Sequence, residues 1–203
     1  GSLRQERRAS PALTFAAVTS CLAFLALPPG ANGQEGGDPD LFVAGAYGFS
    51  DALGGFRILS VSGTGTRDDP IILTEELQSA TPVTLTIRTV QSIRLMGQGG
   101  YFASGTLHMR IRAINGGGQG WIEFGFELQE IKDRPSSFGD GLSFDQRRED
   151  QELISSDTFK RFSRDFEPSD RLLFREGSVD VGDTAGFSFV VTDFTPRWEF
   201  YLV

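Results

Sequence analysis

Short runs in which hydrophobic and polar residues alternate recur through most of the chain after residue 40, and they constrain its fold more than any other feature. The alternation is clearest in residues 107–113 and 122–128, where Leu, Met, Ile, Phe or Ala occupies every second position. A period of two places these side chains on one face of a β-strand. Asn115 and the three consecutive glycines that follow it lie between the two runs, so the pattern predicts a β-hairpin with a Gly-rich loop.

Further runs of the same kind predict further strands. They are residues 57–62, 71–74, 83–88, 171–174, 187–191 and 198–202. Residues 63–70 are rich in Gly, Thr and Asp and end in Pro, which makes the first two of these runs a second predicted hairpin. Turns rather than βαβ connections join the runs. We therefore expect an all-β chain, folded as an antiparallel β-sandwich of jelly-roll or immunoglobulin-like type.

The segment 132–170 breaks this rhythm and is rich in charged residues, Ser, Gly and Asp. Asp157 is a candidate helix N-cap, and Phe159, Phe162 and Phe166 follow it at spacings of three and four. This spacing predicts a short helix whose aromatic stripe covers the core. We expect the charged remainder of the segment to be a docking surface for a partner.

Residues 1–30 differ from the rest of the chain. Residues 11–27 are uncharged and mostly hydrophobic, and Arg4, Arg7 and Arg8 precede them. A basic flank stays in the cytoplasm, so everything beyond the segment is exported. Its 17 residues are fewer than the roughly 20 of a usual spanning helix, which leaves two alternatives open: a signal peptide cleaved near residues 31–33, or a retained transmembrane anchor. Retention, our working hypothesis, requires a membrane assembly for the helix to pack against.

The sequence thus predicts three parts: a basic flank with a hydrophobic helix (1–30), a Gly-, Pro- and acid-rich linker (31–40) and a β domain (41–203). Residues 1–30 hold three Arg and one Glu, so the exported remainder has 16 basic and 26 acidic residues, a net charge of −10. This charge argues against binding nucleic acid or anionic lipid through the bulk surface. Cys21, the only cysteine, lies in the hydrophobic segment, so the β domain has no internal disulfide.

One segment resembles a known class of proteins. Asn115–Leu128 reads Asn-Gly-Gly-Gly-Gln-Gly-Trp-Ile-Glu-Phe-Gly-Phe-Glu-Leu. It resembles the Gly-rich turn, Trp-x-x-Phe and alternating strand of exported bacterial β-sandwich domains, including those of PEP-CTERM-type proteins, with weaker similarity at residues 139–144 and around Trp198. No Pro-Glu-Pro motif or second hydrophobic segment accompanies it. The resemblance implies a sandwich fold and no particular activity.

Candidate catalytic groups are few. A Ser-His-Asp site would have to use His108, the only histidine, with Ser92 or Ser104, and neither serine lies in a nucleophile elbow. Glu123 and Glu127 share one strand face, but at roughly 13 Å apart along the strand they exceed the roughly 5 to 10 Å of a glycosidase pair. We therefore expect no catalytic or cofactor-binding residues.

Metal-binding residues are not expected either. One His and one Cys cannot supply the four ligands of a structural zinc site. Calcium is the one cofactor for which loops offer carboxylates, although none has EF-hand spacing. The acidic pairs are Asp38 with Asp40, Asp68 with Asp69, Asp140 with Asp145, and Asp180 with Asp183.

These observations predict a non-enzymatic β-sandwich on the periplasmic side of a bacterial inner membrane, with its N-terminus in the cytoplasm. Residues 11–27 would anchor it as an accessory or structural subunit of a respiratory, photosynthetic or envelope complex, in contact with the lipid bilayer and with other subunits. One alternative is a secreted carbohydrate- or matrix-binding module with a cleaved signal peptide, in which Trp121, Trp198 and tyrosines stack on the ligand. Another is a hydrolase with carboxylates from different strands.

Overall fold

The structure, a computed structural model, describes residues 41–93, 103, 105–137, 139–144, 153–165, 169–193 and 197–203. All of them belong to the unit Gly37–Val203. These residues form strands in two sheets and no α-helix, which confirms the all-β class. Within these ranges no helix has the length and apolar character needed to cross a membrane. The predicted N-terminal helix, Cys21 and the linker lie outside the described residues.

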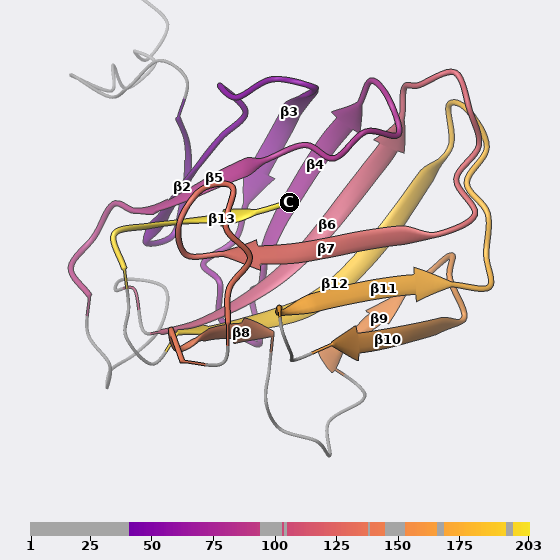
Figure 1. Ribbon diagram of the computed structural model, residues 1–203. Helices are drawn as coiled ribbons and strands as arrows, with labels where there is room; N and C mark the ends of the chain where they lie inside the picture. The colour runs from indigo at the N-terminus through magenta and orange to yellow at the C-terminus, as the bar shows by residue number, and fades with distance from the viewer. Residues whose placement is uncertain are drawn as a thin grey trace, which may run out of the picture. The chain divides into compact units, whose positions relative to one another are not determined.

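The larger sheet contains seven antiparallel strands. Their order is β1 (Phe42–Ala44), β2 (Tyr47–Ser50), β5 (Leu85–Thr89), β13 (Glu199–Leu202), β7 (Phe124–Gln129), β11 (Arg171–Arg175) and β10 (Arg161–Asp165). The last strand of the chain therefore lies in the middle of the sheet, between β5 and β7 (Figure 1). The predicted strands at 83–88, 122–128, 171–174 and 198–202 are confirmed within one to two residues.

The second sheet has the order β3 (Phe56–Ser62), β4 (Ile71–Leu77), β6 (Thr106–Asn115), β12 (Thr184–Asp193) and β8 (Leu142–Phe144), and β9 (Ser155–Ser156) also pairs with β12. The predicted β3–β4 hairpin is confirmed. The pairing of β4 with β6 is parallel, in contrast to the antiparallel pairing that we expected throughout. The intervening strand β5 belongs to the other sheet, so the chain returns and enters β6 in the direction of β4.

The predicted hairpin of residues 107–113 and 122–128 is wrong, because β6 and β7 belong to different sheets. Buried Asn115 shapes the connection: its Nδ2 donates to the carbonyl oxygens of Gln119 (2.8 Å) and Val179 (3.2 Å), and its Oδ1 accepts from the N–H of Gly117 (3.1 Å). These bonds help hold a loop that carries the chain from one sheet to the other. Each strand alternates because each presents one face to the shared core.

The predicted helix after Asp157 is also wrong. Residues 161–165 form β10, which pairs with β11, and Phe166 lies outside the described residues. Ser156 Oγ, not Asp157, accepts from the N–H of Phe159 (3.2 Å). The carboxylate of Asp157 instead accepts from the N–H of Gly186 in β12 (2.7 Å). Backbone pairing with β11 and β12 thus prevails over the helical spacing of the phenylalanines, and the segment 132–170 extends both sheets through β8, β9 and β10.

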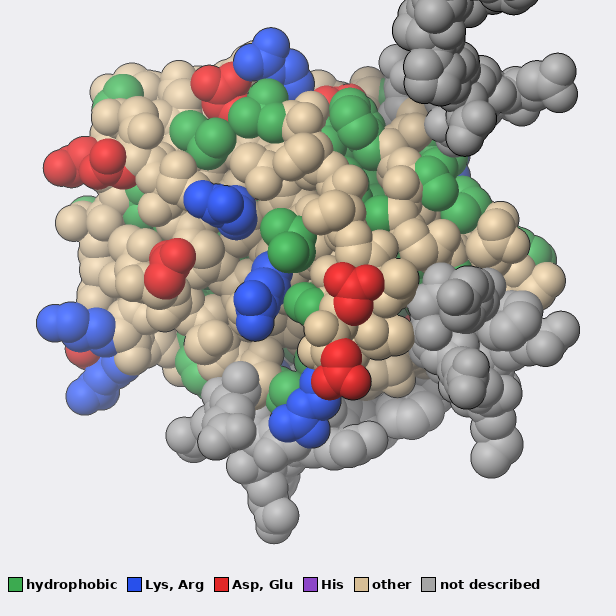
Figure 2. Space-filling model, turned by 180° about the vertical axis from the view of Figure 1, so that it is seen from behind, with side chains coloured by type: hydrophobic (Ala, Val, Ile, Leu, Met, Phe, Trp, Pro, Cys, Tyr) green, Lys and Arg blue, Asp and Glu red, His purple; other side chains and the backbone are tan. Residues whose placement is uncertain are grey.

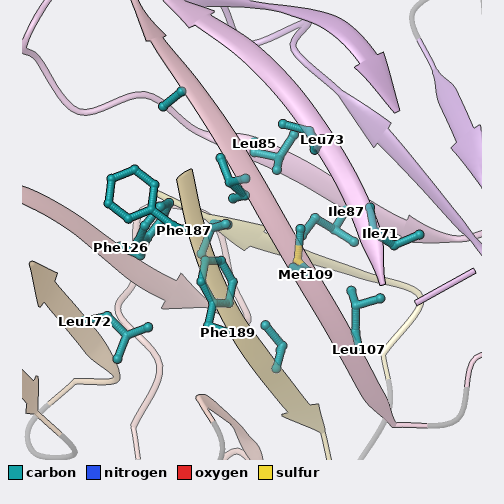
Figure 3. Packing of buried hydrophobic residues seen from close by; sticks show 14 of the residues in the cluster. Ile71, Leu73, Leu85, Ile87, Leu107, Met109, Phe126, Leu172, Phe187 and Phe189 are labelled. Carbon is teal, nitrogen blue, oxygen red and sulfur yellow. The ribbon is translucent and has the colours of Figure 1, made fainter. Parts of the chain in front are cut away.

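Phenylalanine side chains join the two sheets. The ring of Phe187 in β12 lies 4.6 Å and 5.2 Å, centroid to centroid, from Phe124 and Phe126 of β7, and 5.0 Å from Phe174 of β11. Figure 3 shows Phe126 and Phe187 next to each other within the core. Aromatic pairs of this kind contribute about 0.5–1.5 kcal/mol each beyond the burial of their area. They therefore hold β7 and β11 against β12.

Charged side chains of both signs are interspersed on the face of the molecule opposite to that of Figure 1 (Figure 2). Hydrophobic side chains lie among them, and no region of a single charge sign stands out on this face.

We predict that Phe187→Ala lowers the free energy of unfolding by about 3–5 kcal/mol, because it leaves a cavity where the two sheets meet. Urea denaturation measures this change. Phe162→Ala is the control, since that half-buried ring contacts Phe174 at 6.0 Å near the sheet edge and its removal should cost clearly less. Equal losses in the two variants would show that Phe187 does not connect the sheets.

Candidate functional site

A cavity of about 500 Å³ lies between the two sheets. Glu75 of β4 and Ile111 of β6 form its back wall, and residues 79–83, Trp121 and residues 123–127 are also part of its lining. Ligand pockets in proteins commonly measure about 300–1,000 Å³ and are mostly apolar. Hydrophobic side chains dominate this lining, so its size and composition suit a small or elongated apolar ligand.

The cavity crosses the seven-stranded sheet. Phe126 and Leu172 line it from the buried face, whereas their neighbours Glu127, Arg171 and Leu173 line it from the outer face. Successive side chains of a strand point to opposite faces, so a space that touches both sets passes through the sheet. Leu202 and Val203 also line it. The passage therefore lies where β13 ends between β5 and β7 (Figure 1).

Glu75 is the unusual residue of this cavity. It shares the inward face of β4 with Ile71, Leu73 and Leu77, and it is only 5% exposed. Its strand neighbours in register are the apolar residues Ile58 and Ala113. Within the described ranges, no hydrogen bond or ion pair to its carboxyl group is observed.

Burial raises the pKa of Glu75 to about 8. The physical cause is loss of water around the charged form, with no neighbouring cation to offset it. The side chain is therefore mostly protonated at pH 7. In that state it offers one O–H donor and acceptor oxygens to whatever occupies the cavity.

The two carboxylates predicted to share one strand face lie at the outer rim of the cavity. Only Glu127 belongs to β7, because that strand begins at Phe124 and Glu123 precedes it. Glu127 forms an ion pair with Arg171 and accepts a hydrogen bond from Gln129 Nε2 (2.8 Å). Glu123 lies 3.5 Å from Arg175. Both are thus engaged with cationic or amide groups of this chain, unlike Glu75 behind them. Of the three carboxyl groups of Glu75, Glu123 and Glu127, only that of Glu75 is unpaired.

Within the described residues, the aromatic side chains proposed for sugar stacking do not form a common surface, and Tyr101 lies outside these residues. Trp121 is 7% exposed, pairs through its backbone with Val179, and its ring lies 5.2 Å from that of Phe124. Trp198 is 66% exposed. Tyr47 is buried, and the hydroxyl of Tyr201 bonds to Glu199. Trp198 alone of the two tryptophans is available to a ligand on the surface.

His108 and Asp140, two further candidate residues, lie in a paired strand and in a turn. His108 lies in β6 opposite Val190, and its backbone N–H donates to the carbonyl of Gly65 (3.0 Å). Asp140 accepts from the N–H groups of Ser137 and Leu142, both at 3.0 Å. No group of three or more His, Cys, Asp or Glu side chains that could hold a metal occurs within the ranges described above. Ser104, Asp38, Asp40 and Asp145 lie outside those ranges.

The sequence analysis missed Glu75 as a site residue, although a signal for it was present. The predicted strand ended at Thr74, but the alternation of Ile71 and Leu73 continues to Leu77. Extending the period of two places Glu75 inside. No sequence signal indicated the cavity itself, because the cavity depends on which strands become neighbours.

Comparisons of the chain with protein-family models, with curated proteins and with solved structures give no match. Function is therefore inferred from the geometry of the cavity and its surroundings.

We predict that the protein loses stability between about pH 5 and pH 8 and that Glu75→Gln removes much of this loss. The folded state keeps a proton that the unfolded state releases near pH 4.5, so the free energy of unfolding falls as the pH rises through this window and levels off above about 8. At about 1.4 kcal/mol per pKa unit the effect amounts to several kcal/mol. Urea denaturation from pH 5 to pH 9 measures it.

Glu76→Gln is the matched control for this experiment. Glu76 is the next residue, but its carboxylate faces outward and lies 2.9 Å from Arg57. The control should keep the pH dependence of the wild type. The assignment of Glu75 as the buried acid fails when Glu75→Gln shows the same pH dependence as the wild type.

Proposed function

We propose that this chain is a non-enzymatic binding domain, a β-sandwich of jelly-roll or immunoglobulin-like type whose ligand occupies the cavity between the sheets. The observation that carries the proposal is an apolar cavity of about 500 Å³ that crosses one sheet and ends at the unpaired carboxyl group of Glu75. A ligand in such a cavity gains binding energy from apolar contacts, and the one polar group provides selectivity.

Binding accounts for the site better than hydrolysis does. Acid and base catalysis by carboxylates requires two groups that both reach the reacting bond. Glu123 and Glu127 are already paired with arginines at the rim, which leaves Glu75 alone at the back wall. Carbohydrate binding has less support as well, because Trp121 does not form a surface platform: it is only 7% exposed and lines the mostly apolar cavity.

We predict that the neutral fluorescent probe N-phenyl-1-naphthylamine binds in the cavity and that Ile111→Phe weakens its binding at least tenfold. Ile111 forms part of the back wall, so the larger ring fills space that the probe needs. Fluorescence titration measures the dissociation constant. Because the ring enters an empty space, the variant should lose little stability in urea.

Ile71→Phe is the control for the filling experiment. Ile71 is equally buried, but it lies in the packed part of the core and does not line the cavity. Overpacking there should cost about 1–3 kcal/mol of stability and leave probe binding unchanged. Unchanged binding in Ile111→Phe, or no binding by the wild type, would contradict the proposed function.

We also propose, from the sequence, that this binding occurs on the periplasmic side of a bacterial inner membrane, where the domain serves as an accessory or structural subunit of a membrane complex. The hydrophobic residues 11–27 behind three arginines support this placement. A partner held in the cavity would link the domain to other subunits.

Membrane fractionation tests the anchor. The full chain should pellet with the inner membrane and resist extraction by salt, since a retained hydrophobic helix holds it there, whereas a variant that begins at Gln34 should remain in the soluble fraction. A soluble native protein whose N-terminal sequence begins near Gln34 would instead favour the secreted alternative.

A further inference from the structure

The buried carboxyl group of Glu75 has no partner within the part of the chain that the structure describes, and its surroundings limit what can bind to it. The side chain is 5% exposed and lines the cavity together with Ile111. Its neighbours in register, Ile58 of β3 and Ala113 of β6, have side chains that cannot form hydrogen bonds. The carboxyl group is therefore left for a polar group of the ligand.

The charges of the cavity lining favour a cation over an anion. The ionisable side chains among the described lining residues are Glu75, Glu123, Glu127 and Arg171. Arg171 forms an ion pair with Glu127, and Arg175, outside the lining, lies 3.5 Å from Glu123. An anionic ligand group would thus find no unpaired cation among these residues, and it would disfavour ionisation of Glu75. A cationic group would find a partner in that carboxyl group.

Aromatic side chains of the lining suit a cation that carries an apolar body. Trp121, Phe124 and Phe126 all line the cavity, and the ring of Phe124 lies 5.2 Å from that of Trp121 and 5.1 Å from that of Phe126. Aromatic rings pack against apolar groups, and their faces also attract ammonium ions within about 6 Å of the ring centroid. The lining therefore combines apolar contact for a hydrocarbon chain with groups that stabilise a positive charge.

We propose that the ligand of the cavity is a small hydrophobic amine whose ammonium group binds the carboxylate of Glu75 and whose hydrocarbon part lies against the apolar lining. The proposal rests on the proposed function, since it names the ligand class of the same cavity. An alcohol would form an ordinary hydrogen bond with Glu75, whereas a bond between ammonium and carboxylate is charge-assisted and about twice as strong. An amine therefore gains more from this position than an alcohol of the same length.

Binding of the ammonium form releases a proton. In the free protein burial raises the pKa of Glu75 to about 8, so this carboxyl group is mostly protonated at pH 7. An alkylammonium group, with a pKa close to the value of about 10.4 for Lys, keeps its own proton at this pH. The complex contains the carboxylate, so the proton of Glu75 passes to water. The affinity for the amine should therefore rise almost tenfold from pH 6 to pH 7 and level off above about pH 8.

The test compares 1-octylamine, 1-octanol and octanoate, which share a chain length and differ in the polar group. Calorimetry with the full chain at pH 8 should give octylamine an affinity at least tenfold higher than that of octanol, and octanoate the lowest of the three. Glu75→Gln should lower the affinity for octylamine at least tenfold and leave that for octanol within threefold, because the amide keeps a hydrogen-bonding group without the charge. Glu76→Gln is the matched control, since Glu76 faces outward and pairs with Arg57, and it should change neither affinity.

A second arm leaves the protein unchanged and measures the released proton. Octylamine binding is repeated in two buffers that differ in their heat of ionisation, because the difference in observed heat gives the number of protons released. We expect about one proton per bound amine at pH 6.5, where the carboxyl group of free Glu75 is protonated, and close to none at pH 9. Octanol should release no proton at either pH.

The outcomes separate this proposal from the proposed function. Equal affinities of octylamine and octanol, tighter binding of octanoate, octylamine binding that Glu75→Gln leaves unchanged, or no proton release at pH 6.5 would each overturn the amine as the ligand class. The cavity would then remain a site for other apolar ligands, provided that N-phenyl-1-naphthylamine binds. Failure of the three octyl compounds and of this probe to bind would overturn the proposed function as well.

Discussion

The contact between phenylalanine rings of the two sheets is the interaction on which the rest of the structure depends. Each sheet has one apolar face, and neither face is stable in water until it is covered. Phe187 lies at the centre of this contact and meets rings from both β7 and β11. This contact places β7 opposite β6 and β12 rather than beside them. The loop after Asn115 must therefore cross between the sheets.

The cavity lies where this packing is incomplete. Its lining combines Glu75 and Ile111 of the smaller sheet with residues of the larger one. Glu75 stands there at a position where the alternation of β4 would otherwise place an aliphatic side chain. A buried carboxyl group without a partner lowers stability. Costs of this kind are commonly retained at functional sites, and a ligand with a polar group that reaches Glu75 would offset this one.

The elements that the sequence predicted correctly are those whose signal is local. The hairpin of residues 57–62 and 71–74 is one of them, because the turn-rich polar loop of residues 63–70 brings its two strands together. Residues 107–113 and 122–128 were correctly predicted as strands and wrongly paired. Alternation reports that one face is buried, but not which sheet contributes the covering face. The phenylalanines after Asp157 misled for a related reason, since Phe159 in a turn and Phe162 in a strand both reach the core without a helix.

By itself the sequence determined that residues 41–203 form many short strands around an apolar core, because a period of two is set by the geometry of each strand alone. It also contained the inward position of Glu75, which follows from the same period along β4. The partners of each strand, the central place of β13 and the cavity between the sheets were decided only by the tertiary structure. These depend on contacts between residues far apart in the chain, such as Glu127 with Val203, and no local pattern encodes which distant edges will meet.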